Sequence, residues 1–285
     1  MTAGPESDRA GSDEAGSGTP ATGSTVTACL LIIGNEILSG RTQDKNLAFI
    51  GQRLNDLGIR LTEVRVIPDI EATIVETLNE VRRRFDYVFT TGGIGPTHDD
   101  ITAECVAKAF GRALVISPEA RAILEAHYEP GQLTEARLRM ARTPEGAVLI
   151  ENPVSKAPGF QVENVFVMAG IPSIMQAMFA SLQHRLVGGR PLRSRSVAVD
   201  MGESFVAAGL ARLQARFPAV EMGSYPFNRG GVFGTRLVLR ATDDALLDAA
   251  AAELESFLVA LEARHAWEES AAEAAPGVGE RQQSA

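Results

Sequence analysis

Glycines and carboxylates are concentrated in one short segment of the chain, TTGGIGPTHDD. Gly92, Gly93 and Gly95 lack a Cβ atom, so their backbone N–H groups can approach a ligand closely and form an anion-binding nest. Asp99 and Asp100 follow at the start of an expected helix, whose positive end also favours an anion. One aspartate could cap that helix while the other holds a divalent cation that bridges phosphates. A tight turn with two capping aspartates is the alternative interpretation.

Three other polar segments supply further candidates. Asp69 in IPDI and Glu36 in GNEILSG would add carboxylates, and two carboxylates facing one pocket can share a metal, or one can act as a base. Lys156 in NPVSKAPGF could meet a phosphate. In isolation, Asp69 is better explained as a helix N-cap and Lys156 as a solvated surface residue, and the alternative for Glu36 is a solvated loop residue. The remaining candidate ligand-binding residues are Gly34, Asn35, Ser39, Asn46, Thr91, Gly170, Pro172 and Ser173.

Two sets of these candidates also have a purely structural explanation. Ser39 and Asn46 could bond the polar edge of a ligand or cap the next helix. The segment GIPS, which contains Gly170, Pro172 and Ser173, opens an expected helix, and the free N–H groups there could hold an anion. An ordinary helix start explains the same pattern.

The elements around these segments are expected to form a doubly wound, mostly parallel α/β sheet over residues 26–188. The run VTACLLII at the start of this region is continuously apolar, which fits a strand buried on both faces. Strands then alternate with helices of periodic apolar spacing. Ligands of such sheets bind beyond the carboxyl ends of the strands. Four segments, GNEILSG, PDIE, TGGIGPTHDD and MAGIPS, each follow an expected strand, so we expect one site there.

Other parts of the chain have weaker patterns. Residues 117–142 are expected to be helical with a break near EPGQ, and Glu163 and Asn164 to form a hairpin turn. Residues 189–264 follow a β-α-β-β-α order, which predicts a smaller α+β domain. Residues 1–25 and 265–285 are rich in small and polar residues, so we expect disordered tails.

Composition narrows the possible partners. The formal net charge is −9, which disfavours nucleic acid as a partner. No apolar run reaches the length of a membrane span, so no membrane association is expected. The two cysteines, Cys29 and Cys105, both lie in apolar segments. They are expected to be reduced core residues of a cytoplasmic protein.

The motifs, in their order, resemble a known family. LIIGNEILSGRTQDKN, VIPD, TTGGIGPTHDDITAE, NPVSKAPGF and MAGIPS are similar to the molybdopterin-binding (MoaB/Mog-like) domain, and most of all to the competence/damage-inducible protein A family. The resemblance covers about residues 27–187 and extends through the small domain. It implies a short form without the C-terminal deamidase domain, and a homo-oligomer.

The resemblance also implies a function. Asp69 and Asp100 match the two aspartates of the family's site, which binds a pterin or a nucleotide pyrophosphate together with a divalent metal, Mg²⁺ in the first place. We therefore expect a metal-dependent pyrophosphatase (a hydrolase) for ADP-ribose or a related dinucleotide. Molybdopterin adenylyl transfer or cofactor handling is one alternative, although His98-Asp99 stands where adenylyltransferases have a basic pair. A non-catalytic module that binds a nucleotide or pterin is the other.

Overall fold

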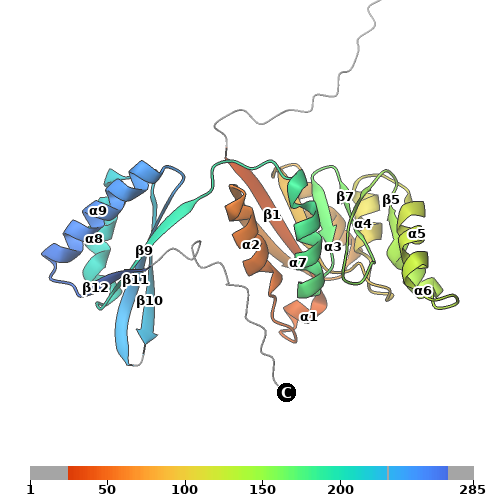
Figure 1. The fold of residues 1–285 in the computed structure, drawn as a ribbon, viewed down its shortest axis with the longest axis horizontal. Helices are drawn as coiled ribbons and strands as arrows, with labels where there is room; N and C mark the ends of the chain where they lie inside the picture. Colours follow the sequence, from red (N-terminus) through yellow and green to blue (C-terminus); the bar gives the residue numbers. More distant parts are fainter. Residues whose placement is uncertain (1–24, 230, 269–285) are drawn as a thin grey trace, which may run out of the picture.

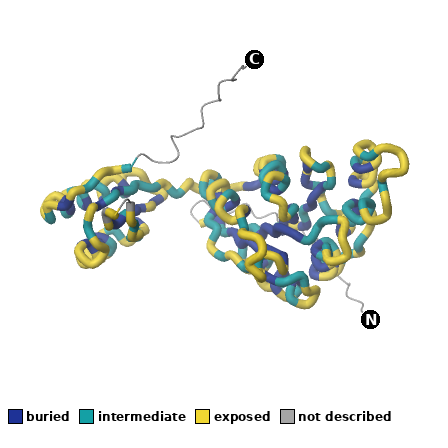
Figure 2. The backbone as a smooth tube through the Cα atoms, turned by 90° about the horizontal axis from the view of Figure 1, so that it is seen from below, coloured by how far each residue is buried: buried dark blue, intermediate teal, exposed yellow. Residues whose placement is uncertain are grey.

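The computed structural model describes residues 25–229 and 231–268, which form two bodies joined by a single connection (Figure 1). Most of the two predicted tails, residues 1–24 and 269–285, lies outside the described residues. Figure 2 shows that buried residues gather in the interior of each body. Within the described residues, no helix is both long enough and apolar enough to cross a membrane.

The larger body is built on a six-stranded mixed sheet, and the predicted fold class is confirmed. The strand order is β2-β1-β3-β8-β7-β6, and β2, β1, β3 and β8 run parallel to their neighbours in this order. Only β7 runs antiparallel, because it forms the predicted hairpin with β8. The bounds are Val26–Ile33 for β1, Ile59–Ile67 for β2, Tyr87–Thr91 for β3, Val148–Ile150 for β6, Gly159–Val162 for β7 and Val165–Met168 for β8.

Helices cover both faces of this sheet because its central strands are apolar on both sides. On β1, Leu30 and Ile32 pack with helices α2 and α7 on one face, whereas Leu31 and Ile33 pack with α3 and α4 on the other. Cys29 and Cys105 are buried in the second cluster as free thiols, and burial raises the pKa of each to about 12. The helices are α1 (Asn35–Leu38), α2 (Asn46–Asp56), α3 (Glu71–Val81), α4 (Thr102–Ala109) and α7 (Pro172–Leu182).

The segment predicted as helical over residues 117–142 is only partly so. Helix α5 (Pro118–His127) and the short α6 (Glu135–Leu138) are followed by a 3₁₀ turn (Arg139–Ala141) and strand β5 (Arg142–Pro144). The last residues leave the helix because β5 pairs with β4 (Leu114–Ile116) in a two-stranded antiparallel sheet. This pairing brings the turn at residues 139–141 to the side of the main sheet where β3 ends.

The smaller body is an antiparallel sheet with the order β10-β11-β9-β12, covered by two helices. Its core is separate and joins side chains of β9, β11, α8 and α9. The predicted tail beginning at residue 265 is wrong for its first four residues, which form edge strand β12 against β9. The bounds are β9 (Arg193–Val199), α8 (Glu203–Arg216), β10 (Glu221–Arg229), β11 (Val232–Ala241), α9 (Asp244–Ala260) and β12 (His265–Glu268).

Polar contacts hold β12 in place, although its composition resembles a tail. The His265 ring nitrogens lie 2.7 Å from the Ala263 carbonyl oxygen and 2.9 Å from Glu255 Oε2. The Trp267 indole N–H donates to the same Glu255 oxygen at 2.8 Å. Because both ring nitrogens face acceptors, the protonated imidazole satisfies the geometry best. The Ala263 carbonyl, and then Glu255, accordingly raise the pKa of His265 above its ordinary 6.5.

Docking of β12 is therefore expected to weaken as the pH rises. A raised pKa in the folded state gives stability that is complete below pH 6.5 and is lost as the pH passes through the folded-state pKa. Fluorescence of Trp267, the single tryptophan, measures this docking as the pH is raised from below 6.5. His265→Gln should remove the pH dependence, and an unchanged dependence in that variant would contradict the assignment.

Candidate functional site

The loops that follow β1, β2, β3 and β8 meet at one cavity of about 540 Å³. Parallel neighbours end at the same edge of a sheet, so four segments far apart in sequence are brought together there. Of the predicted site residues, those that line this cavity are Gly34, Glu36, Asp69, Gly92, Gly93, Gly95, Asp99, Asp100, Gly170 and Pro172. The volume lies within the range of small-molecule sites.

The glycine loop is fixed to the start of α4 by buried hydrogen bonds. The hydroxyl of the fully buried Thr102 donates to the Gly92 carbonyl at 3.0 Å, and the Thr102 N–H donates to the Gly93 carbonyl at 3.0 Å. Gly92 has a φ of 104°, which only glycine adopts readily. A Cβ atom at Gly95 would lie 2.6 Å from Asp100 Oδ2, so the loop passes directly against this carboxylate.

The N–H groups of the loop divide into two sets. The Gly92 N–H donates to the Met168 carbonyl at 3.1 Å, so the prediction that it contributes to an anion nest is wrong. Gly34 is similarly occupied, because its N–H donates to the Ile67 carbonyl at 3.1 Å. Within residues 25–229 and 231–268, the N–H groups of Gly93, Ile94 and Gly95 have no hydrogen-bond acceptor. These three consecutive donors are the ones available to an anion.

Asp69 and Asp100 are not helix caps. The N-cap positions of α3 and α4 are Ile70 and Ile101, and neither helix has a side-chain cap. Asp69 Oδ2 instead accepts the Asn35 N–H at 2.9 Å, which ties the loop after β2 to the loop after β1. The capping alternatives are therefore wrong for both aspartates.

Asp100 is oriented by its own loop. Its Oδ2 accepts the Thr97 N–H at 2.8 Å and the Thr97 hydroxyl at 2.5 Å. For Asp100 and for Asp69, the second carboxylate oxygen, Oδ1, has no hydrogen-bond donor in the described part of the chain. Each side chain is therefore positioned by one oxygen and keeps the other available.

The cavity lining is acidic. Glu36, Asp69, Asp99 and Asp100 contribute carboxylates, and no described lysine or arginine lines the same cavity. The Thr97 hydroxyl, and then the backbone of Asp99 itself, hold the pKa of Asp99 below its usual value. An anionic ligand would meet unfavourable charge there unless a cation accompanied it.

The donor set fits a hard divalent ion that is bound together with a ligand. Among the described residues, no three histidine, cysteine or carboxylate side chains are grouped so as to hold a metal by themselves. Mg²⁺ is commonly bound by one or two carboxylates with substrate phosphates and water completing its shell. Asp69 and Asp100, each with one uncommitted oxygen, match that requirement.

Six predicted residues lie outside the lining of the cavity, and several have structural contacts. The buried Asn46 donates from Nδ2 to the Gly170 carbonyl at 2.8 Å, and so fixes the loop before α7. The Ser39 hydroxyl donates to the Glu36 carbonyl at 3.2 Å, and the Asn35 N–H is bound to Asp69. Thr91 is buried within β3, and Ser173 lies in the first turn of α7.

Lys156 is the sixth, and it lines a different cavity, of about 640 Å³, between α5 and the end of α7. The loop containing it is shaped by the buried Asn152, whose Oδ1 accepts the Val154 and Ser155 N–H groups, both at 3.1 Å. Lys156 itself has a φ of 64°, a backbone conformation that is uncommon for residues other than glycine.

The sequence interpretation missed lining residues from two segments. Asn152, Ser155 and Ala157 come from the loop after β6, and Met140 comes from the turn after α6. The Asn-Pro dipeptide at the start of the first segment was a recognisable turn signal. Met140 had no such signal, because its position depends on the pairing of β4 with β5.

Fold and site together define an α/β ligand-binding domain of the MoaB/Mog-like class. The family model described as "Probable molybdopterin binding domain" matches residues 29–187, and the model "FAD synthase, middle domain" matches residues 191–264. The chain belongs to the molybdopterin-binding-domain family. The predicted resemblance to the competence/damage-inducible protein A (CinA) type is confirmed.

Three similar proteins illustrate this membership. A protein of Archaeoglobus fulgidus is 36% identical over 197 residues, which cover 69% of this chain and 84% of that protein. The crystal structure of the CinA protein of unknown function from Thermoplasma acidophilum shares 36% identity and a TM-score of 0.54, over 57% of this chain and 99% of that one. A "Probable FAD synthase" of Caenorhabditis briggsae is 29% identical over 88% of this chain, which spans 53% of its length.

Proposed function

We propose that the chain is a metal-dependent pyrophosphatase that acts on ADP-ribose or a related dinucleotide. The observation that carries this proposal is the pairing, around one cavity, of uncommitted N–H donors at residues 93–95 with uncommitted carboxylate oxygens of Asp69 and Asp100. N–H donors suit phosphate oxygens, whereas carboxylates repel them. A ligand that satisfies both sets is a phosphate anhydride accompanied by a divalent cation.

Each residue then has a distinct role. The N–H groups of Gly93, Ile94 and Gly95 bind oxygens of one phosphate, and the start of α7 at Pro172 lines the same cavity. Asp69 and Asp100 would hold a divalent ion, Mg²⁺ in the first place, which neutralises charge on the phosphates when bound.

Hydrolysis requires a water molecule placed in line with the P–O–P bridge. The one uncommitted oxygen of Asp69 either orients this water or helps to hold the ion, since the other oxygen is fixed by the Asn35 N–H. The water adds to one phosphorus, and the bridging oxygen leaves with the other phosphate. ADP-ribose would yield AMP and ribose 5-phosphate.

Two further features support a nucleotide ligand. The second family model and the Caenorhabditis briggsae relative both bear the name of an FAD synthase, and FAD contains a diphosphate. The cavity of about 540 Å³ accommodates part of a dinucleotide.

Molybdopterin adenylyl transfer is the second candidate, favoured by the description of the matched family model. Supplying molybdopterin with MgATP and assaying for the adenylylated product separates the two. A third outcome, binding of a nucleotide or pterin without any product, would identify a binding module.

The direct test is a panel of ADP-ribose, FAD and related dinucleotides incubated with Mg²⁺, Mn²⁺ or Co²⁺. The expected result is cleavage at the anhydride that depends on added metal and stops with a chelator, read by chromatography of the products. If calorimetry shows that these ligands bind but no cleavage occurs, the pyrophosphatase activity is refuted, whereas the assignment of the cavity as a ligand-binding site stands.

A further inference from the structure

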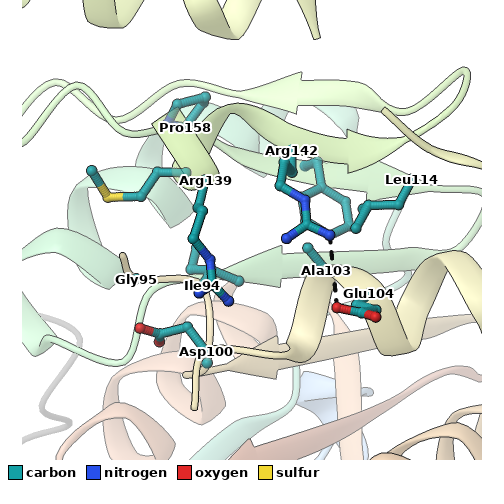
Figure 3. A pocket seen from close by; sticks show the side chains of 12 residues that line it. Ile94, Gly95, Asp100, Ala103, Glu104, Leu114, Arg139, Arg142 and Pro158 are labelled. Atoms are coloured by element: carbon teal, nitrogen blue, oxygen red, sulfur yellow. Dashed lines mark ion pairs between the residues drawn. The ribbon is translucent and has the colours of Figure 1, made fainter. Parts of the chain in front are cut away.

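A small void adjoins the central cavity on the side of the β4–β5 pair (Figure 3). Its volume is about 20 Å³, which is room for a single water molecule. The void and the central cavity share the glycine loop, Asp100 and Met140 in their linings. The void therefore lies next to the loop that we expect to bind phosphate.

Two arginines line this void, and they differ in their contacts. Arg142 forms an ion pair with Glu104 at 3.7 Å. Arg139 extends from the 3₁₀ turn toward Ile94 and Gly95, with Asp100 on the same side of the loop (Figure 3). The Arg139 guanidinium has no hydrogen bond, ion pair or ring contact with any residue that the structure describes, and its carboxylate neighbour Asp100 is not within ion-pair distance.

This lack of a partner is unusual for the described chain. Arg139 is only partly exposed, whereas the other described arginines whose side chains lack a partner, such as Arg41, Arg83 and Arg190, are exposed. Other partly buried arginines, such as Arg82 and Arg185, donate hydrogen bonds. A half-buried guanidinium loses hydration, and that loss is recovered only when acceptors replace the water.

The charge of the neighbouring site indicates what those acceptors are. The central cavity has four carboxylates and no described basic side chain in its lining. Arg139 stands beside the N–H donors of Gly93 and Gly95, so it adds positive charge at the position where the proposed phosphate would lie. The planar guanidinium presents two N–H groups in the spacing that matches two phosphate oxygens.

We propose that Arg139 is a substrate-binding residue that grips the diphosphate held by the glycine loop and gives the site its preference for a diphosphate over a monophosphate. This assignment rests on the proposed function, because it requires a phosphate anhydride at the same loop. The guanidinium and the N–H groups at residues 93–95 contact the anhydride from two directions. A monophosphate satisfies only one of these sets, and the cost of leaving the other unpaired disfavours it.

The test measures binding rather than turnover, with ADP and AMP as probes in Mg²⁺ by isothermal titration calorimetry. In Arg139→Ala, we expect the Kd of ADP to rise about 10- to 100-fold and that of AMP to change much less, since a charge-assisted contact is lost. Arg139→Lys should recover only part of this preference, because the lysine ammonium lacks the paired N–H groups of the planar guanidinium. Arg142→Ala, which removes the paired arginine of the same void, should retain the preference.

Several outcomes would overturn the proposal. An unchanged ratio of the ADP and AMP affinities in Arg139→Ala refutes it, as does an equal loss in Arg142→Ala, and so does a wild-type protein that binds no diphosphate. If circular dichroism shows that Arg139→Ala does not fold, the same ratio of affinities is measured in Arg139→Lys and Arg139→Gln, and an unchanged ratio in both refutes the proposal. If the wild-type protein binds ADP tightly but cleaves no dinucleotide, the proposed pyrophosphatase activity is refuted. The ratio of the ADP and AMP affinities still tests the role of Arg139 in that case.

Discussion

Asp100→Asn is expected to lower the turnover of a cleaved dinucleotide by at least about 1,000-fold, because charge neutralisation at the bridging oxygen contributes several kcal/mol to the barrier. Asparagine keeps the shape of the side chain and one oxygen for the Thr97 N–H, which lies 2.8 Å away. The substitution removes the negative charge and leaves the glycine loop in place. The measurement is kcat with saturating Mg²⁺, together with the affinity for the metal in the presence of ADP.

The control for this variant is Asp56→Asn. Asp56 lies at the end of α2, where it forms an exposed ion pair with Arg53 at 3.7 Å. It does not line the cavity. Its substitution removes the same charge from the protein and should leave kcat unchanged. If Asp100→Asn and Asp56→Asn both retain the wild-type kcat, the Asp100 carboxylate has no part in the reaction, and the metal-binding role given to Asp100 is wrong.

The convergence of the acidic segments could be anticipated from the sequence because it follows from topology alone. VTACLLII is continuously apolar, and only a strand covered on both faces accommodates such a run. A sheet covered on both faces by helices is parallel at its centre, and the carboxyl ends of its strands share an edge. The sequence therefore predicts that Asp69 and Asp100 share that edge, but it does not specify the distance between them.

The contacts of individual atoms could not be anticipated in this way. Whether the Gly92 N–H faces a ligand or the Met168 carbonyl depends on the register of β3 against β8, which periodicity does not specify. Arg139 and Met140 reach the site because a stretch with a helical pattern ends early in the β4–β5 pair. A local pattern contains no information on that long-range pairing.

The strand at the start of the predicted C-terminal tail could not be predicted from local sequence either. His265 and Trp267 belong to a segment whose composition resembles that of residues 269–285, yet Glu255 on α9 binds both side chains. An edge strand of four residues has too few positions for its alternation to be recognised. Its pairing with β9 became evident only from the structure.

Gly92→Ala is expected to lower the free energy of unfolding of the larger body by about 3 kcal/mol or more. A Cβ atom at this position would overlap the Ile33 carbonyl oxygen, and a φ of 104° is strained for any residue with a side chain. Ile33 is buried at the end of β1, so the backbone cannot move aside without separating β1 from β3. The measurement is urea unfolding followed by far-UV circular dichroism.

Gly111→Ala distinguishes the collision from the strain. Gly111 also has a positive φ, of 61°, but a Cβ atom there would meet nothing within 4 Å. Its substitution should cost about 1 kcal/mol, the ordinary penalty of a left-handed residue. Trp267 fluorescence reports the smaller body separately, since its core shares no residue with the sheet at Gly92. Equal losses of stability in the two variants would mean that strain alone, and not the contact with Ile33, requires glycine at the mouth of the site.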